Sequence, residues 1–291
     1  MSFISEIKEQ LESGLTLKFI SNIFTEINAT KIKKIRASFE KNRRFYDEIT
    51  YAYQSIKVIA NKSGFTVRKG EIVDLETAKK TKISTLLLAI TSNSHFYGAL
   101  NLNVAKKVKE DWLNLDADKM VIGQTGIEYL NSFGLKGGFQ EIRLQKDYPN
   151  RQEVSQLVEK TKSYDRVLVY FPSFVTLLTQ KVGVLDITQT PASKGGIKAL
   201  EEEKIVYIFE PELEKILVFF EKQIRSLLFV RSILESELSR TAARLLSMNN
   251  AQQRAEDLVK TKKRQLTQAS RSVSNARLLE TFSGISMWNN Q

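Results

Sequence analysis

The placement of proline constrains the fold of this chain more than any other feature of its sequence. The 4 prolines all lie in the middle of the 291 residues, at Pro149, Pro172, Pro191 and Pro211. Because proline is the residue that most strongly interrupts a helix, long segments at both ends are free to be helical. Apolar residues, among them Ile20, Ile23, Phe24 and Ile27, recur at spacings of three and four over Ile4–Ala60 and return to one face, which predicts a long helix. The same pattern over Leu213–Ser286 predicts a second long helix.

These two helices are too long for an ordinary globular core to cover. At 1.5 Å per residue the second would extend about 110 Å, and periodicity beyond about 25 residues indicates a coiled coil or a similar extended pairing. Gly14 is the weak point of the first helix, where we expect a break or kink. We therefore expect an antiparallel coiled coil of an N-terminal helix (residues 1–62) and a C-terminal helix (residues 212–291), with a central domain (residues 63–211) at one end.

The central residues alternate between strand patterns and helix patterns. Strands are predicted where short runs are apolar and rich in β-branched or aromatic residues, at Ile83–Thr91, Lys119–Ile122, Phe139–Leu144, Arg166–Phe171, Val182–Thr188 and Lys204–Phe209. Helical patterns occur at Gly98–Trp112, Gly126–Phe133 and Arg151–Ser163, and Thr190–Gly196 is a predicted loop. Such alternation is typical of a mostly parallel sheet. The predicted fold class is therefore α/β, a Rossmann-like central domain joined to a long coiled coil.

The residue inventory excludes several kinds of active site. The chain has no cysteine and a single histidine, His95, so disulfides, thiol nucleophiles, Cys-ligated zinc and multi-His metal sites are excluded. No glycine-rich phosphate-binding motif follows a predicted strand. His95 follows the first predicted strand, and without a second ligand we interpret it as a structural loop residue. No apolar run approaches the roughly 18–20 residues that span a bilayer, and the N-terminus lacks a signal-peptide pattern, so we expect a soluble, intracellular protein.

The charge of the chain favours anionic partners. Lysine and arginine number 44 against 33 acidic residues, which gives a net charge of +11. Basic residues cluster on both predicted terminal helices, at Lys31, Lys33, Lys34, Arg36, Lys41, Arg43 and Arg44 and at Arg254, Lys260, Lys262, Lys263, Arg264, Arg271 and Arg277. Such clusters are usually the solvated face of a coiled coil. The alternative is a basic coiled-coil module that binds nucleic acid or an anionic membrane.

Four segments, in order along the chain, resemble the γ subunit of F-type ATP synthases. Leu234–Ala251 is similar to its L-x-E-S-x-x-S-E-x-x-A-R-M-x-A-M-x-x-A signature, with Glu280 and Gly284 at the E and G of its terminal E-I-x-x-G. Ile20–Ile32 resembles its I-T-K-A-M-x-x-V-A-A-S-K-M segment, Ser92–Asn101 its S-D-x-G-L-C-G-x-x-N loop, and Tyr207–Pro211 its Y-x-Y-E-P.

The resemblance implies a rotor shaft without catalytic residues or cofactor. In this family the coiled coil lies inside a hexamer of α and β subunits, and the α/β domain forms a foot beside the ε subunit and the membrane c-ring. Rotation couples proton flow to ATP synthesis or hydrolysis on the β subunits. The resemblance places the chain peripherally on the cytoplasmic face of a bacterial plasma membrane, rather than at an organelle inner membrane, with no nucleic acid and no small-molecule substrate as partner.

The resemblance also assigns contact residues. Arg271, Asn275 and Arg254 would contact β, and Tyr207, Phe209 and Glu210 in the foot would contact the membrane ring. Phe282, Ile285, Met287 and Trp288 would form an apolar tip in the hexamer bearing.

This chain departs from the family pattern at several of these positions. The R-Q-A-x-I-T pattern is Ser270–Asn275 here, the T-D-N pattern is Gln252–Arg254, and the S-E of the signature is Ser239-Arg240. A γ-like shaft of a specialised rotary ATPase that is not coupled to protons is therefore a further alternative.

Overall fold

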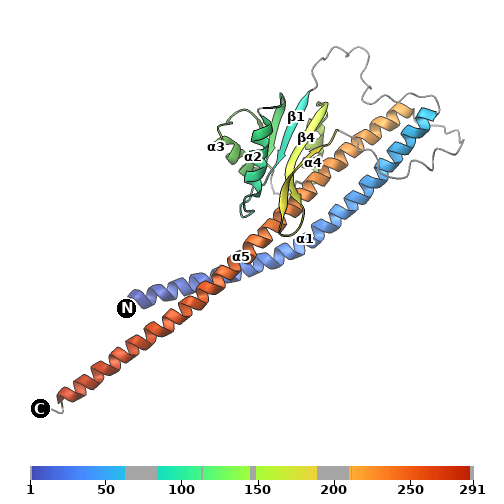
Figure 1. Ribbon diagram of the computed structural model, residues 1–291. Helices are drawn as coiled ribbons and strands as arrows, with labels where there is room; N and C mark the ends of the chain where they lie inside the picture. The colour runs from blue at the N-terminus through green and yellow to red at the C-terminus, as the bar shows by residue number, and fades with distance from the viewer. Residues whose placement is uncertain are drawn as a thin grey trace. The chain divides into compact units, whose positions relative to one another are not determined.

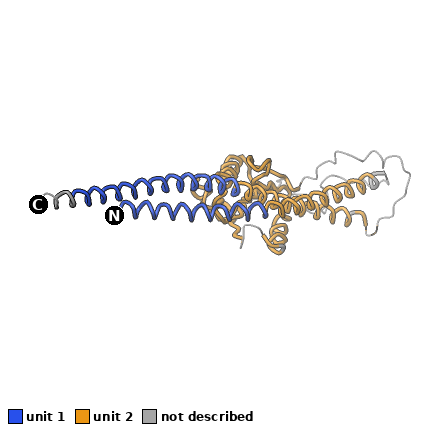
Figure 2. The backbone as a smooth tube through the Cα atoms, turned by 90° about the horizontal axis from the view of Figure 1, so that it is seen from below, with its two compact units in different colours: residues 1–30, 244–291 blue, residues 31–243 orange. Residues whose placement is uncertain are grey.

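A computed structural model of the chain describes residues 2–62, 84–112, 114–144, 149–188, 210 and 212–288. The chain divides into two compact units, which Figure 2 distinguishes by colour. Unit 1 comprises residues 1–30 and 244–291, and unit 2 comprises residues 31–243. Both predicted terminal helices are present: α1 (Ser2–Lys62) has 61 residues and α5 (Leu213–Trp288) has 76. Each of these helices contributes residues to both units.

Unit 2 contains a five-stranded sheet with the order β3-β2-β1-β4-β5. Its strands are β1 (Thr85–Ile90), β2 (Asp118–Ile122), β3 (Gln140–Ile142), β4 (Arg166–Phe174) and β5 (Gln180–Asp186). The pairs β1–β2, β1–β4 and β2–β3 are parallel, and β4–β5 is antiparallel. The predicted mostly parallel α/β sheet is therefore confirmed. The sixth predicted strand, Lys204–Phe209, and the predicted loop Thr190–Gly196 lie outside the described residues.

Helices cover both faces of this sheet (Figure 1). Because side chains alternate along a strand, β1 sends Leu87 and Ala89 to one face and Leu86, Leu88 and Ile90 to the other. The first face packs against α2 (Leu100–Trp112) and α3 (Gln124–Ser132). The second packs against α4 (Arg151–Thr161) and against the unit 2 portions of α1 and α5. Burial on both faces explains why the central strands read as continuous apolar runs.

Within unit 2 the two long helices run antiparallel. Lys31 pairs with Glu237, the Arg231 guanidinium lies 6.0 Å from the centre of the Phe39 ring, and the Tyr53 hydroxyl donates to Glu221 at 2.6 Å. Contact positions therefore rise along α1 while they fall along α5. Aromatic side chains supply much of this packing, including Tyr46 and Tyr53 of α1 and Phe229 of α5, which are buried.

Within unit 1 the helices also pair antiparallel, through small residues of α1. Lys18 lies 3.1 Å from Glu256, and a Cβ added at Gly14 would lie 3.1 Å from Val259. The buried positions of α1 recur every seven residues, at Ile7, Gly14, Ser21 and Asn28. Gly14 thus lies inside a continuous helix, where the absence of a side chain permits close approach of α5, and the helix does not break at this residue.

Candidate functional site

The carboxyl end of the parallel sheet is where α/β folds commonly bind ligands, next to the N-terminus of a following helix. Here β1 is followed by Thr91–Ser94, and β2 by Gly123 and then α3. The chain's own groups occupy the first amides of α3. Gln124 N donates to Asn93 Oδ1 at 3.1 Å, Thr125 N to the Ser92 carbonyl at 2.9 Å, and Gly126 N to Thr91 Oγ1 at 3.1 Å.

Two glycines at this edge are packed against Thr91. A Cβ on Gly123, whose φ is +100°, would lie 2.7 Å from the Thr91 backbone, and one on Gly126 would lie 2.4 Å from Thr91 Oγ1. Strand β1, the end of β2 and the start of α3 are therefore drawn tightly together. The anion-binding amides that this fold usually presents are here part of the internal packing.

His95 lies in the loop that follows this edge and is exposed. The backbone of its neighbour Phe96 has a φ of 70°, a conformation that non-glycine residues seldom adopt. The Phe96 side chain is 70% exposed. Across the residues that the structure describes, no three His, Asp or Glu side chains gather where they could hold a metal ion.

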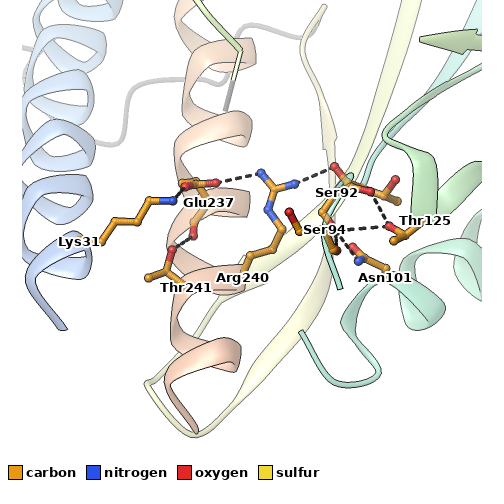
Figure 3. A network of polar contacts seen from close by, with 9 residues as sticks. Lys31, Ser92, Ser94, Asn101, Thr125, Glu237, Arg240 and Thr241 are labelled. Atoms are coloured by element: carbon orange, nitrogen blue, oxygen red, sulfur yellow. Dashed lines mark hydrogen bonds and ion pairs between the residues drawn. The ribbon is translucent and has the colours of Figure 1, made fainter. Parts of the chain in front are cut away.

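A buried charged cluster adjoins the same edge from the side of α5 (Figure 3). Arg240 of α5 donates to the Thr91 carbonyl at 2.7 Å and to Glu237 Oε2 at 3.2 Å. Glu237 in turn pairs with Lys31 of α1. The Arg240 and Glu237 side chains are 1% and 3% exposed, whereas Lys31 is 44% exposed.

Sequence reasoning missed this cluster. The only signal was a pair of charged residues inside an apolar helical repeat, together with the departure from the family's S-E at Ser239-Arg240. A charge in such a position either faces solvent or is buried with partners, and one partner of Arg240, Thr91, lies 149 residues away in the chain.

In unit 1, α1 exposes one face of large apolar side chains. We define the apolar strip as Leu17, Ile20, Phe24 and Ile27, which are 40–54% exposed. Three of these, together with Ile23, belong to the repeat that predicted helix pairing. The structure instead buries the small and polar residues Gly14, Ser21 and Asn28 and turns the larger side chains outward. Contiguous exposed apolar surface of this kind marks an interaction site.

The three predicted β-contact residues are exposed on the unit 1 portion of α5. Arg271 and Asn275 are four residues apart and share one face of the helix. Arg254 lies 17 residues earlier, which places it about 26 Å along the helix and about a quarter turn around it. The structure therefore brings two of the predicted residues together and separates the third.

The end of α5 is apolar and exposed in its described part. Phe282 is 67% exposed, and Leu278 and Leu279 beside it are 56% and 70% exposed. The helix continues through Ile285, Met287 and Trp288, whose side chains lie outside the described residues. Of the predicted foot residues, Glu210 is exposed, and Tyr207 and Phe209 lie outside the described part of the chain.

None of the described helices combines the length and the apolar character that crossing a membrane requires.

The sequence pattern of the ATP synthase family matches residues 4–286. The chain is 24% identical to the sodium ion specific ATP synthase gamma chain of Acetobacterium woodii, over 88% of this chain and 89% of that one. It is also 24% identical to the ATP synthase gamma chain of Staphylococcus saprophyticus, over 98% of each.

A solved structure shares the fold. The chain superposes on the central stalk and c-ring structure of the Tetrahymena thermophila mitochondrial ATP synthase with a TM-score of 0.55 and 19% identity, covering 80% of this chain and 99% of that one. Because the family pattern extends across nearly all residues of both units, the chain belongs to the ATP synthase family, as a gamma chain of the F-type enzyme.

Proposed function

We propose that this chain is the central-stalk rotor shaft of an F-type ATP synthase, in which it couples ion translocation to ATP synthesis or hydrolysis on the β subunits. The match of the family pattern to residues 4–286 carries the proposal and favours it over a nucleic-acid or membrane-binding module. The paired long helices, with the apolar strip exposed on one of them, support the same conclusion.

The mechanism requires a shaft that resists twisting and turns within a ring of partner subunits. A proline-free α1 and α5, paired as an antiparallel coiled coil, would supply the stiffness. The heptad spacing of the buried α1 residues Ile7, Gly14, Ser21 and Asn28 supports that pairing. The apolar strip and Phe282 would pack against an apolar bearing formed by the α and β subunits. Arg271, Asn275 and Arg254 would contact acidic loops of β, so that attraction changes with rotation.

The Rossmann-like sheet of unit 2 would form the foot of the stalk. Tyr207, Phe209 and Glu210 would face the membrane c-ring, with the ε subunit beside them. The complex would lie peripherally on the cytoplasmic face of a bacterial plasma membrane. The division of the chain into residues 1–62, 63–211 and 212–291 is part of this proposal.

The carboxyl end of the sheet supports a non-catalytic role for this chain. There the amides of Gln124, Thr125 and Gly126 bind the chain's own oxygens, which leaves nucleotide chemistry to partner subunits. The coupling ion is a matter for direct measurement, because one relative is named sodium ion specific.

Co-expression with the α and β subunits from the same genome tests the proposal. We expect a hexamer with one copy of this chain, and ion transport by the membrane-bound complex, measured for protons and sodium ions separately. Recovery of the chain as a free species beside an empty hexamer would contradict the rotor function. Assembly without any ion transport would favour the specialised rotary ATPase.

Arg271→Ala tests the proposed β contact. We expect the variant to assemble normally and to move fewer ions per ATP hydrolysed, because an exposed arginine that meets an acidic loop contributes to torque rather than to folding. Arg277→Ala, at another exposed arginine of α5, is the matched control. Equal coupling in both variants would remove the assignment.

A further inference from the structure

The charged cluster of Arg240, Glu237 and Lys31 lies in unit 2, and no contact of the proposed rotor mechanism uses it. Arg240 and Glu237 are almost fully buried. Charges removed from water in this way are tolerated only where partners compensate them. Those partners show which parts of unit 2 the cluster connects.

Arg240 connects in two directions. Its Nη1 atom donates to the Thr91 carbonyl at 2.7 Å, and its Nη2 atom donates to Glu237 Oε2 at 3.2 Å. The other oxygen of Glu237 pairs with Lys31 Nζ. In Figure 3 the cluster extends from α1 across α5 to the end of β1. A planar guanidinium suits this geometry, since its fixed donors can reach a carbonyl and a carboxylate at once.

Thr91 is the point at which several elements of the sheet meet. Its hydroxyl donates to the Ile122 carbonyl at the end of β2 at 2.6 Å and accepts from Gly126 N of α3 at 3.1 Å. The adjacent Ser92 accepts from Thr125 N of α3 and, through its hydroxyl, from Asn101 Nδ2 of α2 at 2.7 Å. Arg240 therefore binds the residue at which the ends of β1 and β2 and the start of α3 converge.

Other polar contacts also join α5 to the sheet region. Ser173 Oγ of β4 donates to the half-buried Glu235 Oε1 at 2.5 Å. Ser239 Oγ lies 3.4 Å from the Ser173 carbonyl, and the half-buried Arg225 donates to the Thr161 carbonyl at 3.2 Å. Of these contacts, the Arg240 bond is both charge-assisted and made between two buried residues, and charge-assisted hydrogen bonds shielded from water are the strong ones.

We infer that the cluster of Arg240, Glu237 and Lys31 is the joint that fixes the carboxyl end of the sheet to α1 and α5, so that torque passes between the sheet and the helices. The transmission of torque rests on the proposed rotor function, but the attachment of the sheet to the helices can be tested on the chain alone. The end of the sheet at which related folds bind ligands serves here as an internal attachment point.

Hydrogen exchange of the full chain tests the joint. In Arg240→Met we expect the amides of Thr91, Thr125 and Gly126 to exchange about tenfold faster or more, because local opening no longer breaks a buried charge-assisted bond. Arg240→Lys should give an intermediate rate, since lysine cannot bind both partners in fork geometry. Unit 1 amides should keep their rates, as should all amides in the control Arg264→Met, an exposed arginine of α5.

A double variant separates the attachment from the cost of an uncompensated Glu237. Glu237→Gln with Arg240→Met leaves no unbalanced acidic charge, and we expect the same three amides to remain fast. Wild-type exchange rates of these three amides in the double variant would contradict the proposed joint. Unchanged exchange rates in Arg240→Met, or an equal increase in exchange rate throughout the chain of that variant, would also contradict it.

An engineered cross-link provides the rescue. Because the chain has no cysteine, Ser173→Cys with Ser239→Cys introduces the only thiols, at residues of β4 and α5 that meet where the Ser239 hydroxyl approaches the Ser173 carbonyl. The reduced form of the same variant is the control for losing the Ser173 hydrogen bond to Glu235. In the Arg240→Met background, oxidation should return the three amides toward wild-type rates and reduction should reverse this. Fast exchange in the fully cross-linked protein would show that Arg240 acts on local packing alone.

The same variants in the assembled complex test the mechanical consequence. We expect Arg240→Met to lower the number of ions moved per ATP hydrolysed, and the cross-link to restore it. Wild-type coupling combined with fast exchange would overturn the torque role. A wild-type chain that fails to join the hexamer would instead refute the rotor function, and the exchange result would stand independently.

Discussion

At the scale of single residues, Gly14 shows how the absence of a side chain determines packing in unit 1. Its position faces Val259 and Leu258, and an added Cβ would approach them to 3.1 and 3.2 Å. A methyl group could be accommodated by small shifts of those two flexible side chains. A larger side chain would force the helices apart, because packed interiors tolerate added volume poorly.

Gly14→Leu should therefore weaken the helix pair of unit 1 by about 1–3 kcal/mol. Hydrogen exchange of unit 1 amides measures the change, and unit 2 serves as an internal reference. Ser13→Leu adds the same side chain at an exposed position and should have little effect. If the unit 1 amides exchanged at the same rates in Gly14→Leu as in Ser13→Leu, the close approach of the helices at Gly14 would be refuted.

Two buried tyrosines make the stability of unit 2 fall as the pH rises in the alkaline range. Burial, followed by a hydrogen bond to Glu221, raises the pKa of Tyr53, and burial with a hydrogen bond to Asp111 raises the pKa of Tyr170. In the unfolded chain both hydroxyls would lose their protons near the ordinary value of 10.0. Because the folded state holds the protons more tightly, the stabilisation is complete below that pH and is lost as pH rises above it.

We expect the free energy of unfolding to fall by up to about 1.4 kcal/mol per pH unit for each of these tyrosines above pH 10. Tyr53→Phe and Tyr170→Phe should each reduce that slope while costing about 1 kcal/mol at neutral pH, through the lost hydrogen bond. Denaturant unfolding between pH 8 and about 11.5 measures both effects. A slope that neither substitution changes would contradict the pKa assignments.

At the scale of elements, helix α4 carries its own start signal. Asn150 Oδ1 accepts from Glu153 N at 2.8 Å, and Glu153 Oε2 accepts from Asn150 N at 2.7 Å. This reciprocal pair satisfies two helix-end amides. The α4 side chains Leu157 and Val158 pack on the sheet, so the cap also positions part of the core.

Asn150→Ala should destabilise unit 2 by about 1 kcal/mol, as the loss of a good cap typically does. Thermal or denaturant unfolding gives the value, with Gln152→Ala at an exposed position of the same helix as control. A loss equal to that of the control would show that water replaces the cap at no cost.

The strong periodicity of the sequence made most helices and strands predictable. It did not show which part of the protein each apolar face would pack against. The strands β1, β2 and β4 are buried on both faces, so their apolar runs were clear in the sequence. For α1 the same reasoning assigned Ile20, Ile23, Phe24 and Ile27 to the paired face, although the structure exposes them. An apolar face that awaits another subunit has the same pattern as one that packs within the chain.

At the scale of the whole molecule, the apolar strip gives assembly a requirement separate from folding. Ile20→Glu and Phe24→Glu place charges on exposed positions, so the stability of the isolated chain should change by about 0.5 kcal/mol or less. Their recovery in the hexamer should fall about tenfold or more, because a charge would be buried in the bearing.

The control for this prediction is Asn22→Glu, an exposed position of α1 outside the strip. Quantitative co-purification with the α and β subunits compares the three variants. Normal incorporation of Ile20→Glu and Phe24→Glu would show that the strip faces solvent in the complex, and the bearing role would be lost.

Contact residues could be proposed from the sequence only where family motifs extend through the chain. The resemblance assigned Arg271 and Phe282 to contact surfaces, and both are exposed on α5. The attachment through Arg240 and Thr91 joins positions that are 149 residues apart. No local pattern links such a pair, because its partners come together only when the sheet and the long helices fold on one another.

The order of residues in unit 1 also bears on how the protein is made. Residues 1–30 pair with residues 244–291, and everything between them belongs to unit 2. During translation the N-terminal half of this pair leaves the ribosome long before its complement exists, with Ile7, which is buried in the folded chain, still uncovered. The sheet can form first, but unit 1 must wait for the final part of synthesis, because its two halves come from opposite ends of the chain.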